Sequence, residues 1–136
     1  MMHDNTEKIA TDGRAVRILL AEDDEAMRTM LAFMLTVEGF DVTPCFDGLE
    51  LAERLSRDRG EVDLVISDIR MPGMTGLQLL EGLSSSQDSP PMILITAFGG
   101  EDTMAKAMRL GAAAVFSKPF DVTDLVEKAH EVMNRK

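Results

Sequence analysis

The sequence has a single cysteine, few basic residues and no long apolar run, and each of these shortages excludes a class of protein. Cys45 cannot form a disulfide within the chain, and we expect it to be a small buried apolar side chain. The 14 lysines and arginines are outnumbered by 24 aspartates and glutamates, which gives a net charge of −10. That charge argues against direct nucleic-acid binding and against a polybasic membrane patch. No apolar run approaches the length that spans a membrane.

The first residues of the chain also lack a targeting signal. They show neither the basic segment nor the apolar core of a signal peptide, so we expect a cytoplasmic protein. Residues 1–15 are polar and without periodicity, and are predicted to form a flexible leader. The remaining residues, 16–136, have the length of one domain with a core of its own.

Apolar patterning predicts alternating strands and helices. Short apolar runs predict strands at 18–21, 40–45, 64–68, 92–96 and 114–117. Apolar residues at helical spacing predict helices at 26–35, 48–55, 76–83, 102–110 and 122–133. The run 40–45 contains Pro44, which removes a backbone donor and places this strand near an edge of the sheet.

This alternation predicts a doubly wound α/β fold. Strands separated by helices must be parallel and joined by right-handed crossovers, so five strands form a parallel sheet with helices on both faces. Ligands of such sheets bind at the carboxyl ends of the strands. Reactive side chains are therefore expected directly after each predicted strand.

Polar and charged residues gather at that edge of the sheet. Glu22-Asp23-Asp24 follows the first strand, Asp68 ends the third, Thr96 ends the fourth and Lys118 follows the fifth. Clustered carboxylates stay ionised only beside a counter-charge such as a lysine or a hard cation. Oxygen ligands suit Mg²⁺ or Mn²⁺, and a carboxylate can act as a nucleophile toward phosphorus. The edge therefore indicates phosphoryl chemistry.

Four motifs at these strand ends resemble those of one family. They are Glu22-Asp23, Asp68 with Met71-Pro72 and Gly76 behind it, Thr96-Ala97, and Lys118-Pro119-Phe120. In this order they resemble the receiver domain of two-component response regulators, and the resemblance covers residues 16–136. It implies a flavodoxin-like receiver fold that accepts a phosphoryl group from a histidine kinase or a histidine phosphotransfer protein. Such a domain assists its own phosphorylation and dephosphorylation and is not a multiple-turnover enzyme.

The resemblance also implies a role for each site residue. Asp68 would accept the phosphoryl group in a magnesium-dependent step, Thr96 would contact that group and Lys118 would pair with it. The metal ligands would be Asp23, Glu22 acting through water, Asp68 and the backbone carbonyl of Arg70.

Two local features are also read from the resemblance. Counting back from Met27-Arg28, which resembles the family's usual helix start, assigns the acid pair to Glu22 and Asp23 and leaves Asp24 as a helix N-cap. The peptide bond between Lys118 and Pro119 is expected to be cis.

The sequence departs from the family at one position and leaves several alternatives open. The residue three before Lys118, usually aromatic, is Val115, so the switch could work through an aromatic side chain or through the loop 97–100. The output surface, expected on the fourth helix, fifth strand and fifth helix, could contact an unknown downstream protein or form a phosphorylation-dependent dimer.

The chain could be a stand-alone receiver or the receiver segment of a longer transcriptional regulator. A phosphate-independent interaction module, a flavin-binding module and a phosphohydrolase are the alternatives from other classes. The acidic turn at residues 22–25 would repel a flavin phosphate, and Arg70 stands where a phosphohydrolase would carry a second acid.

Overall fold

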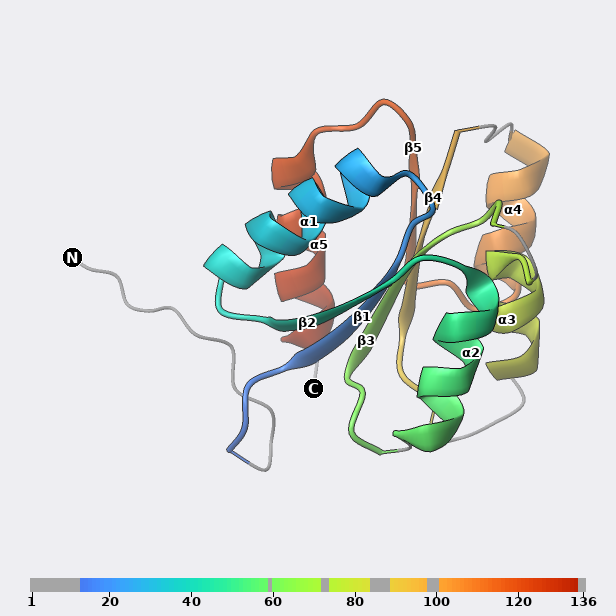
Figure 1. Ribbon diagram of the computed structural model, residues 1–136. Helices are drawn as coiled ribbons and strands as arrows, with labels where there is room; N and C mark the ends of the chain where they lie inside the picture. Colours follow the sequence, from blue (N-terminus) through green and yellow to red (C-terminus); the bar gives the residue numbers. More distant parts are fainter. Residues whose placement is uncertain (1–12, 59, 72–73, 84–88, 98–100, 135–136) are drawn as a thin grey trace.

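The computed structural model describes residues 13–58, 60–71, 74–83, 89–97 and 101–134, which alternate five strands with five helices (Figure 1). In chain order the elements are β1 (Arg17–Ala21), α1 (Glu25–Val37), β2 (Asp41–Cys45), α2 (Gly48–Arg57), β3 (Leu64–Asp68), α3 (Gly76–Leu83), β4 (Met92–Thr96), α4 (Glu101–Arg109), β5 (Ala114–Ser117) and α5 (Val122–Met133). The strand order is β2-β1-β3-β4-β5, and every neighbouring pair is parallel. The doubly wound parallel sheet predicted from the sequence is confirmed.

Helix α1 is slightly longer than its apolar pattern predicted. It begins at Glu25 because the Asp24 side chain accepts a hydrogen bond from the Met27 N–H at 3.1 Å, which satisfies one of the free donors at the helix start. It continues to Val37 and stops before Gly39, whose φ of 99° suits a glycine. The N-cap expected at Asp24 is confirmed.

Two further helix starts are fixed by side-chain caps. Asp47 Oδ1 accepts from the Glu50 N–H at 2.8 Å, and Glu50 Oε1 accepts from the Phe46 N–H at 2.9 Å, so the first turn of α2 is held from both sides. In α5 the Asp121 side chain accepts from the Thr123 N–H at 2.9 Å. Both helices therefore begin where the sequence predicted.

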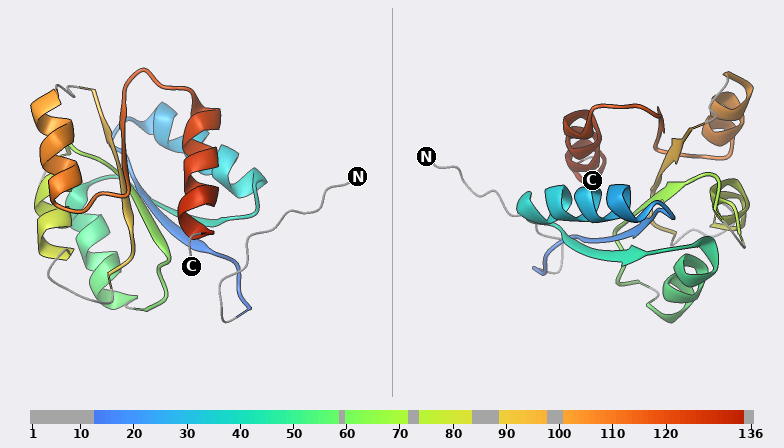
Figure 2. Two further views of the ribbon diagram at one scale, coloured as in Figure 1. Left: turned by 180° about the vertical axis from the view of Figure 1, so that it is seen from behind. Right: turned by 45° about the horizontal axis from the view of Figure 1, so that its top comes forward.

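The sheet lies between two layers of helices. Figures 1 and 2 show α1 and α5 on one face and α2, α3 and α4 on the other. Residues of β1 alternate between the two cores: Ile18 and Leu20 pack toward α1 and α5, while Leu19 and Ala21 pack toward the other helices. Strands β3 and β4 are buried along their whole length, as expected for the centre of a parallel sheet.

Strand β2 lies at one edge of the sheet, as Pro44 predicted. Strands β1 and β3 are neighbours inside the sheet, and their carboxyl ends lie side by side because the two strands are parallel. This places the residues that follow β1 next to the last residue of β3.

The chain is already in contact with the domain shortly before β1. Arg14 Nη1 pairs with Asp63 Oδ2 at 2.8 Å, and Val16 is buried. Residues 1–12, 59, 72–73, 84–88, 98–100 and 135–136 lie outside the described residues. Within the described part of the chain, no helix combines the length and the apolar character needed to cross a membrane.

Candidate phosphoacceptor site

Asp68 is the last residue of β3, and its carboxylate is held in place by two donors. Its side chain is 6% exposed. Lys118 Nζ donates to Asp68 Oδ2 at 2.8 Å, and the Arg70 N–H donates to Asp68 Oδ1 at 2.9 Å. One oxygen thus faces a cation and the other a backbone amide, which fixes the orientation of the carboxylate.

The acidic turn after β1 brings two further carboxylates to Asp68. The Glu22 N–H donates to the Cys45 carbonyl at 3.2 Å, which extends the pairing of β1 with β2 past Ala21. Glu22 is fully buried and Asp23 is exposed. Carboxylate oxygens of Glu22, Asp23 and Asp68 all lie within 4.8 Å of one another. The acid pair predicted from the sequence therefore meets Asp68 in space.

Arg28 holds this turn from the side of α1. Its Nη1 donates to the Glu22 carbonyl oxygen at 2.7 Å, and the Glu22 Oε2 accepts from the Asp24 N–H at 3.0 Å. The sequence motif identifies Arg28 only with the helix start and does not predict this contact. The signal that could have revealed this contact is that Arg28 is the one charged residue between Ala26 and Val37.

The three acids and Lys118 line one pocket at the carboxyl ends of the strands. The pocket has a volume of about 480 Å³. It is lined by Glu22, Asp23, Asp24, Asp68, Arg70, Ala97 and Lys118. The pocket therefore contains the predicted site residues except Thr96.

The carboxylate oxygens that line this pocket are suitable ligands for a hard divalent cation. Glu22 Oε1 is buried and accepts no hydrogen bond, although Lys118 Nζ is 3.1 Å away as an ion pair. An unbonded buried carboxylate oxygen is costly unless a cation satisfies it, and carboxylate oxygens are the ligands that Mg²⁺ prefers. The acidic cluster is typical of the magnesium site of a receiver.

Burial and charge shift the proton affinities of the site. Burial raises the pKa of the Glu22 carboxyl, and the nearby Asp68 charge raises it further, while the Asp24 N–H and Lys118 offset part of the rise. For Lys118, burial acts to lower the pKa, but the hydrogen bond and charge of Asp68, together with Glu22, raise it on balance. Lys118 therefore stays protonated as the counter-charge of the acids.

Thr96 is not a lining residue of the pocket but directly precedes Ala97, which is one. It is buried at the end of β4, its carbonyl oxygen accepts from the Lys118 N–H at 2.8 Å, and its neighbour Ala97 lines the pocket. The peptide bond between Lys118 and Pro119 is cis, as the resemblance implied.

Strand β5 carries Val115 and Phe116 on opposite faces. Val115 packs with the core on the side of α2, α3 and α4, whereas Phe116 packs with the core on the side of α1 and α5. The Phe116 ring lies 5.7 Å from the ring of Phe120. Because successive strand residues face opposite sides, Phe116 does not replace the aromatic side chain that the family usually has at position 115.

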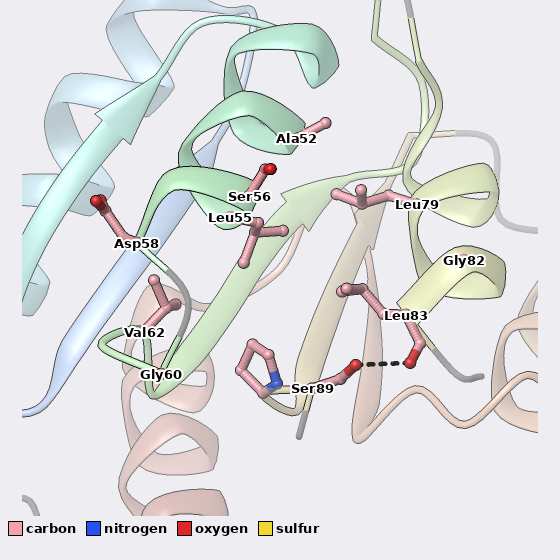
Figure 3. A pocket seen from close by; sticks show the side chains of 11 residues that line it. Ala52, Leu55, Ser56, Asp58, Gly60, Val62, Leu79, Gly82, Leu83 and Ser89 are labelled. Atoms are coloured by element: carbon pink, nitrogen blue, oxygen red, sulfur yellow. Dashed lines mark hydrogen bonds between the residues drawn. The ribbon is translucent and has the colours of Figure 1, made fainter. Parts of the chain in front are cut away.

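A second pocket, of about 330 Å³, lies between the last turns of α2 and α3 (Figure 3). Leu55, Leu79 and Leu83 contribute to its lining, and Ser89 Oγ donates to the Leu83 carbonyl at 2.6 Å. Asp58 is the one carboxylate among its lining residues in the described chain. This pocket therefore lacks the clustered acids that the first one has.

A doubly wound parallel sheet with three carboxylates and a lysine at its carboxyl edge is the arrangement of signalling receiver domains. The chain belongs to the response regulator receiver domain family, whose model matches residues 18–130. It is a two-component phosphorelay domain, a phosphoacceptor rather than a multiple-turnover enzyme.

Individual relatives agree with this assignment. The chain is 35% identical over 123 residues to the regulatory protein AtoC of Escherichia coli, covering 88% of this chain and 26% of AtoC. It is 29% identical over 109 residues to the sporulation initiation phosphotransferase F of Bacillus subtilis, covering 80% of this chain and 86% of that protein. This chain therefore spans only part of the length of such relatives: 26% of AtoC and 51% of the RegX3 proteins.

Solved structures show the same fold. The receiver domain of HemR from Leptospira biflexa superposes with a TM-score of 0.78 at 30% identity, covering 89% of this chain and 96% of that one. The receiver domain of the Francisella response regulator 1452 superposes with a TM-score of 0.82 at 23% identity, covering 88% and 98%.

Proposed function

We propose that Asp68 accepts a phosphoryl group from a phosphohistidine of a partner kinase or phosphotransfer protein. The observation that carries this proposal is the buried Asp68 carboxylate, 2.8 Å from Lys118 Nζ and clustered with two further acids. A buried carboxylate with a fixed orientation and an adjacent cation is a suitable nucleophile, because developing charge on the phosphoryl oxygens is stabilised at once.

The transfer exchanges one bond for another. The bond between phosphorus and the histidine nitrogen breaks, a bond between phosphorus and an Asp68 oxygen forms, and the nitrogen keeps the electron pair. Lys118 pairs with the phosphoryl oxygens, and Thr96 donates a hydrogen bond to one of them. Glu22, Asp23, Asp68 and the Arg70 carbonyl would hold Mg²⁺ or Mn²⁺, which neutralises charge on the phosphoryl oxygens when bound.

Intact-mass spectrometry tests this proposal directly. The protein is incubated with acetyl phosphate, with and without Mg²⁺, as wild type and as Asp68→Asn. Asp41→Asn is the matched control, because Asp41 is an exposed aspartate at the start of β2, outside the pocket. We expect one phosphoryl adduct in wild type and Asp41→Asn that requires Mg²⁺, and none in Asp68→Asn. An adduct that persists in Asp68→Asn would refute the assignment.

The solvent-exposed face of α1 supports docking of a protein phosphodonor. Met30, Phe33, Met34 and Val37 recur at helical spacing and are exposed, Phe33 to 65%. Asp24, the N-cap of α1, lines the pocket, so a protein that covers the pocket to reach Asp68 also meets the start of α1. An exposed apolar stripe on a helix that starts at a reactive pocket is typical of a protein interface.

A docking variant separates the protein donor from the chemistry. Phe33→Ser should slow phosphotransfer from a histidine donor and leave phosphorylation by acetyl phosphate unchanged, because Phe33 is not in the pocket. Met108→Ser on α4 is the control, since Met108 is 52% exposed on a different helix. Equal transfer rates in wild type and Phe33→Ser would exclude α1 as the docking face.

The output of the domain follows from the same site. We propose that a phosphoryl group on Asp68 repositions Thr96 and Lys118 and so biases the α4, β5 and α5 surface toward a downstream protein. The hydrogen bond from the Lys118 N–H to the Thr96 carbonyl supports this, because it joins the two residues across β4 and β5. A role as the receiver segment of a longer transcriptional regulator, and a cytoplasmic location, are part of this proposal.

A further inference from the structure

The start of α3 lies against the end of β3, beside Asp68. The Gly76 N–H donates to the Ile69 carbonyl at 2.8 Å, which closes the loop between β3 and α3 at its base. A methyl group on Gly76 would lie 2.7 Å from the Asp68 carbonyl oxygen, so this close approach depends on a glycine. Arg70, whose N–H bonds to the Asp68 carboxylate, lies within this loop. The described residues Arg70 and Gly76 are therefore anchored to Asp68 or to its neighbour Ile69.

The far side of this loop packs against the first residue of α2. A methyl group on Gly48 would overlap the carbonyl oxygen of Met74 and lie 2.8 Å from its carbonyl carbon and 3.1 Å from its Cβ. Gly48 is buried and is not one of the described glycines with positive φ. The requirement for glycine at position 48 is therefore steric and not conformational.

The first turn of α2 is held too firmly to yield to an added methyl group. Asp47 accepts hydrogen bonds from Glu50 through its side chain at 2.8 Å and from Leu51 through its carbonyl at 3.2 Å. Glu50 in turn binds the Phe46 N–H at 2.9 Å. A side chain on Gly48 would therefore displace Met74 and the loop that carries it rather than the helix.

From these contacts we infer that Gly48 is a positioning residue for the phosphoacceptor pocket. Gly48 lies 20 residues before Asp68 in sequence and acts through Met74, by allowing the residues that lead into α3 to approach α2 while Gly76 packs against the Asp68 carbonyl. The inference rests on the proposed function, since it assigns Gly48 to the pocket's proposed metal site. Mutation of a residue that orients the ligands of a metal, without binding the metal itself, typically changes the metal affinity about 10–100-fold.

The test measures Mg²⁺ binding directly, by following backbone amide resonances during a titration of the unphosphorylated protein with Mg²⁺ alone. Gly48→Ala should raise the Mg²⁺ dissociation constant about 10-fold or more. Gly82→Ala is the matched control, because Gly82 also lies in a helix and a methyl group there meets nothing within 4 Å. It should leave the dissociation constant unchanged, while the helix gains stability from alanine.

The outcomes separate the two proposals. Equal Mg²⁺ affinities in wild type and in a folded Gly48→Ala protein would overturn the role of Gly48 alone, whatever the effect on melting temperature. A wild type that binds no Mg²⁺ would overturn the proposed function and this inference together. If Gly48→Ala does not fold in buffer, the titration is repeated for wild type and variant in trimethylamine N-oxide, which favours the folded state because it is excluded from the protein surface. An affinity equal to that of wild type in the same solvent would overturn the inference.

Discussion

Removal of the Lys118 charge should destabilise the protein far more than loss of an ordinary surface lysine. Lys118→Met keeps the aliphatic stem but leaves Asp68 and Glu22, both buried, without the cation that lies 2.8 and 3.1 Å from them. Two like charges then face each other in a poorly hydrated pocket. We expect the loss to be largest in metal-free buffer at neutral pH, where no other cation replaces the ammonium.

The magnitude follows from the burial of the three side chains. Removing one partner of a buried ion pair costs about 3–5 kcal/mol. The Lys118 side chain is 19% exposed, so water reaches part of the site and the lower end of that range applies, about 3 kcal/mol. For a domain of this length such a loss lowers the melting temperature by roughly 10 °C.

The assay is thermal and urea unfolding followed by far-ultraviolet circular dichroism, because the chain has no tryptophan or tyrosine. Lys128→Met is the control: Lys128 pairs with Glu131 at 3.1 Å, but the Glu131 side chain is 53% exposed. That loss should stay below about 0.5 kcal/mol. Equal losses in the two variants would refute the argument that burial makes the Lys118 pair matter, and added Mg²⁺ should recover part of the Lys118→Met loss.

Three further outcomes are expected. Burial raises the pKa of the Cys45 thiol to about 12, so a thiol reagent at pH 8 should react with the urea-unfolded protein and not with the native one; rapid native labelling would contradict this. Leu31→Ala on the buried face of α1 should cost about 2–5 kcal/mol by urea unfolding, while Phe33→Ala on its exposed face should cost under about 0.5 kcal/mol; similar losses would show that the two faces are wrongly assigned. Burial raises the pKa of Glu22 in the folded state above its value of 4.5 in the unfolded chain, so the folded protein binds this proton more tightly. The resulting contribution to the free energy of unfolding is fully present below pH 4.5 and is lost as the pH rises through the folded-state pKa. Glu22→Gln should therefore become more stable than wild type as pH is raised from 4.5 in metal-free buffer, and a constant difference would contradict the raised pKa.

Local signals predicted the elements well because their causes are local. The spacing of apolar residues and the cap at Asp24 depend only on nearby residues, and the structure confirms both. Pro44 likewise predicted an edge strand, because a missing N–H is tolerated there. Boundaries shifted by a residue where a cap, rather than an apolar residue, started the helix, as at Glu25.

Contacts between segments that are distant in sequence cannot be predicted from local sequence patterns. The close approach of Gly48 to Met74 and the bond from Arg28 to the Glu22 carbonyl left no periodic trace in the sequence. Strand alternation puts Val115 and Phe116 on opposite faces, and the packing shows which core each side chain enters.

The sequence by itself determined the order of strands and helices, and it determined which side chains follow each strand, because both are properties of short segments. The tertiary structure decided the distances. Lys118 and Asp68, 50 residues apart, meet at 2.8 Å, and Glu22 is buried with one oxygen that accepts no hydrogen bond. The physical reason is that the parallel pairing of β1 with β3, of β3 with β4 and of β4 with β5 brings separate strand ends to one edge. That pairing depends on the whole core and not on any single stretch of chain.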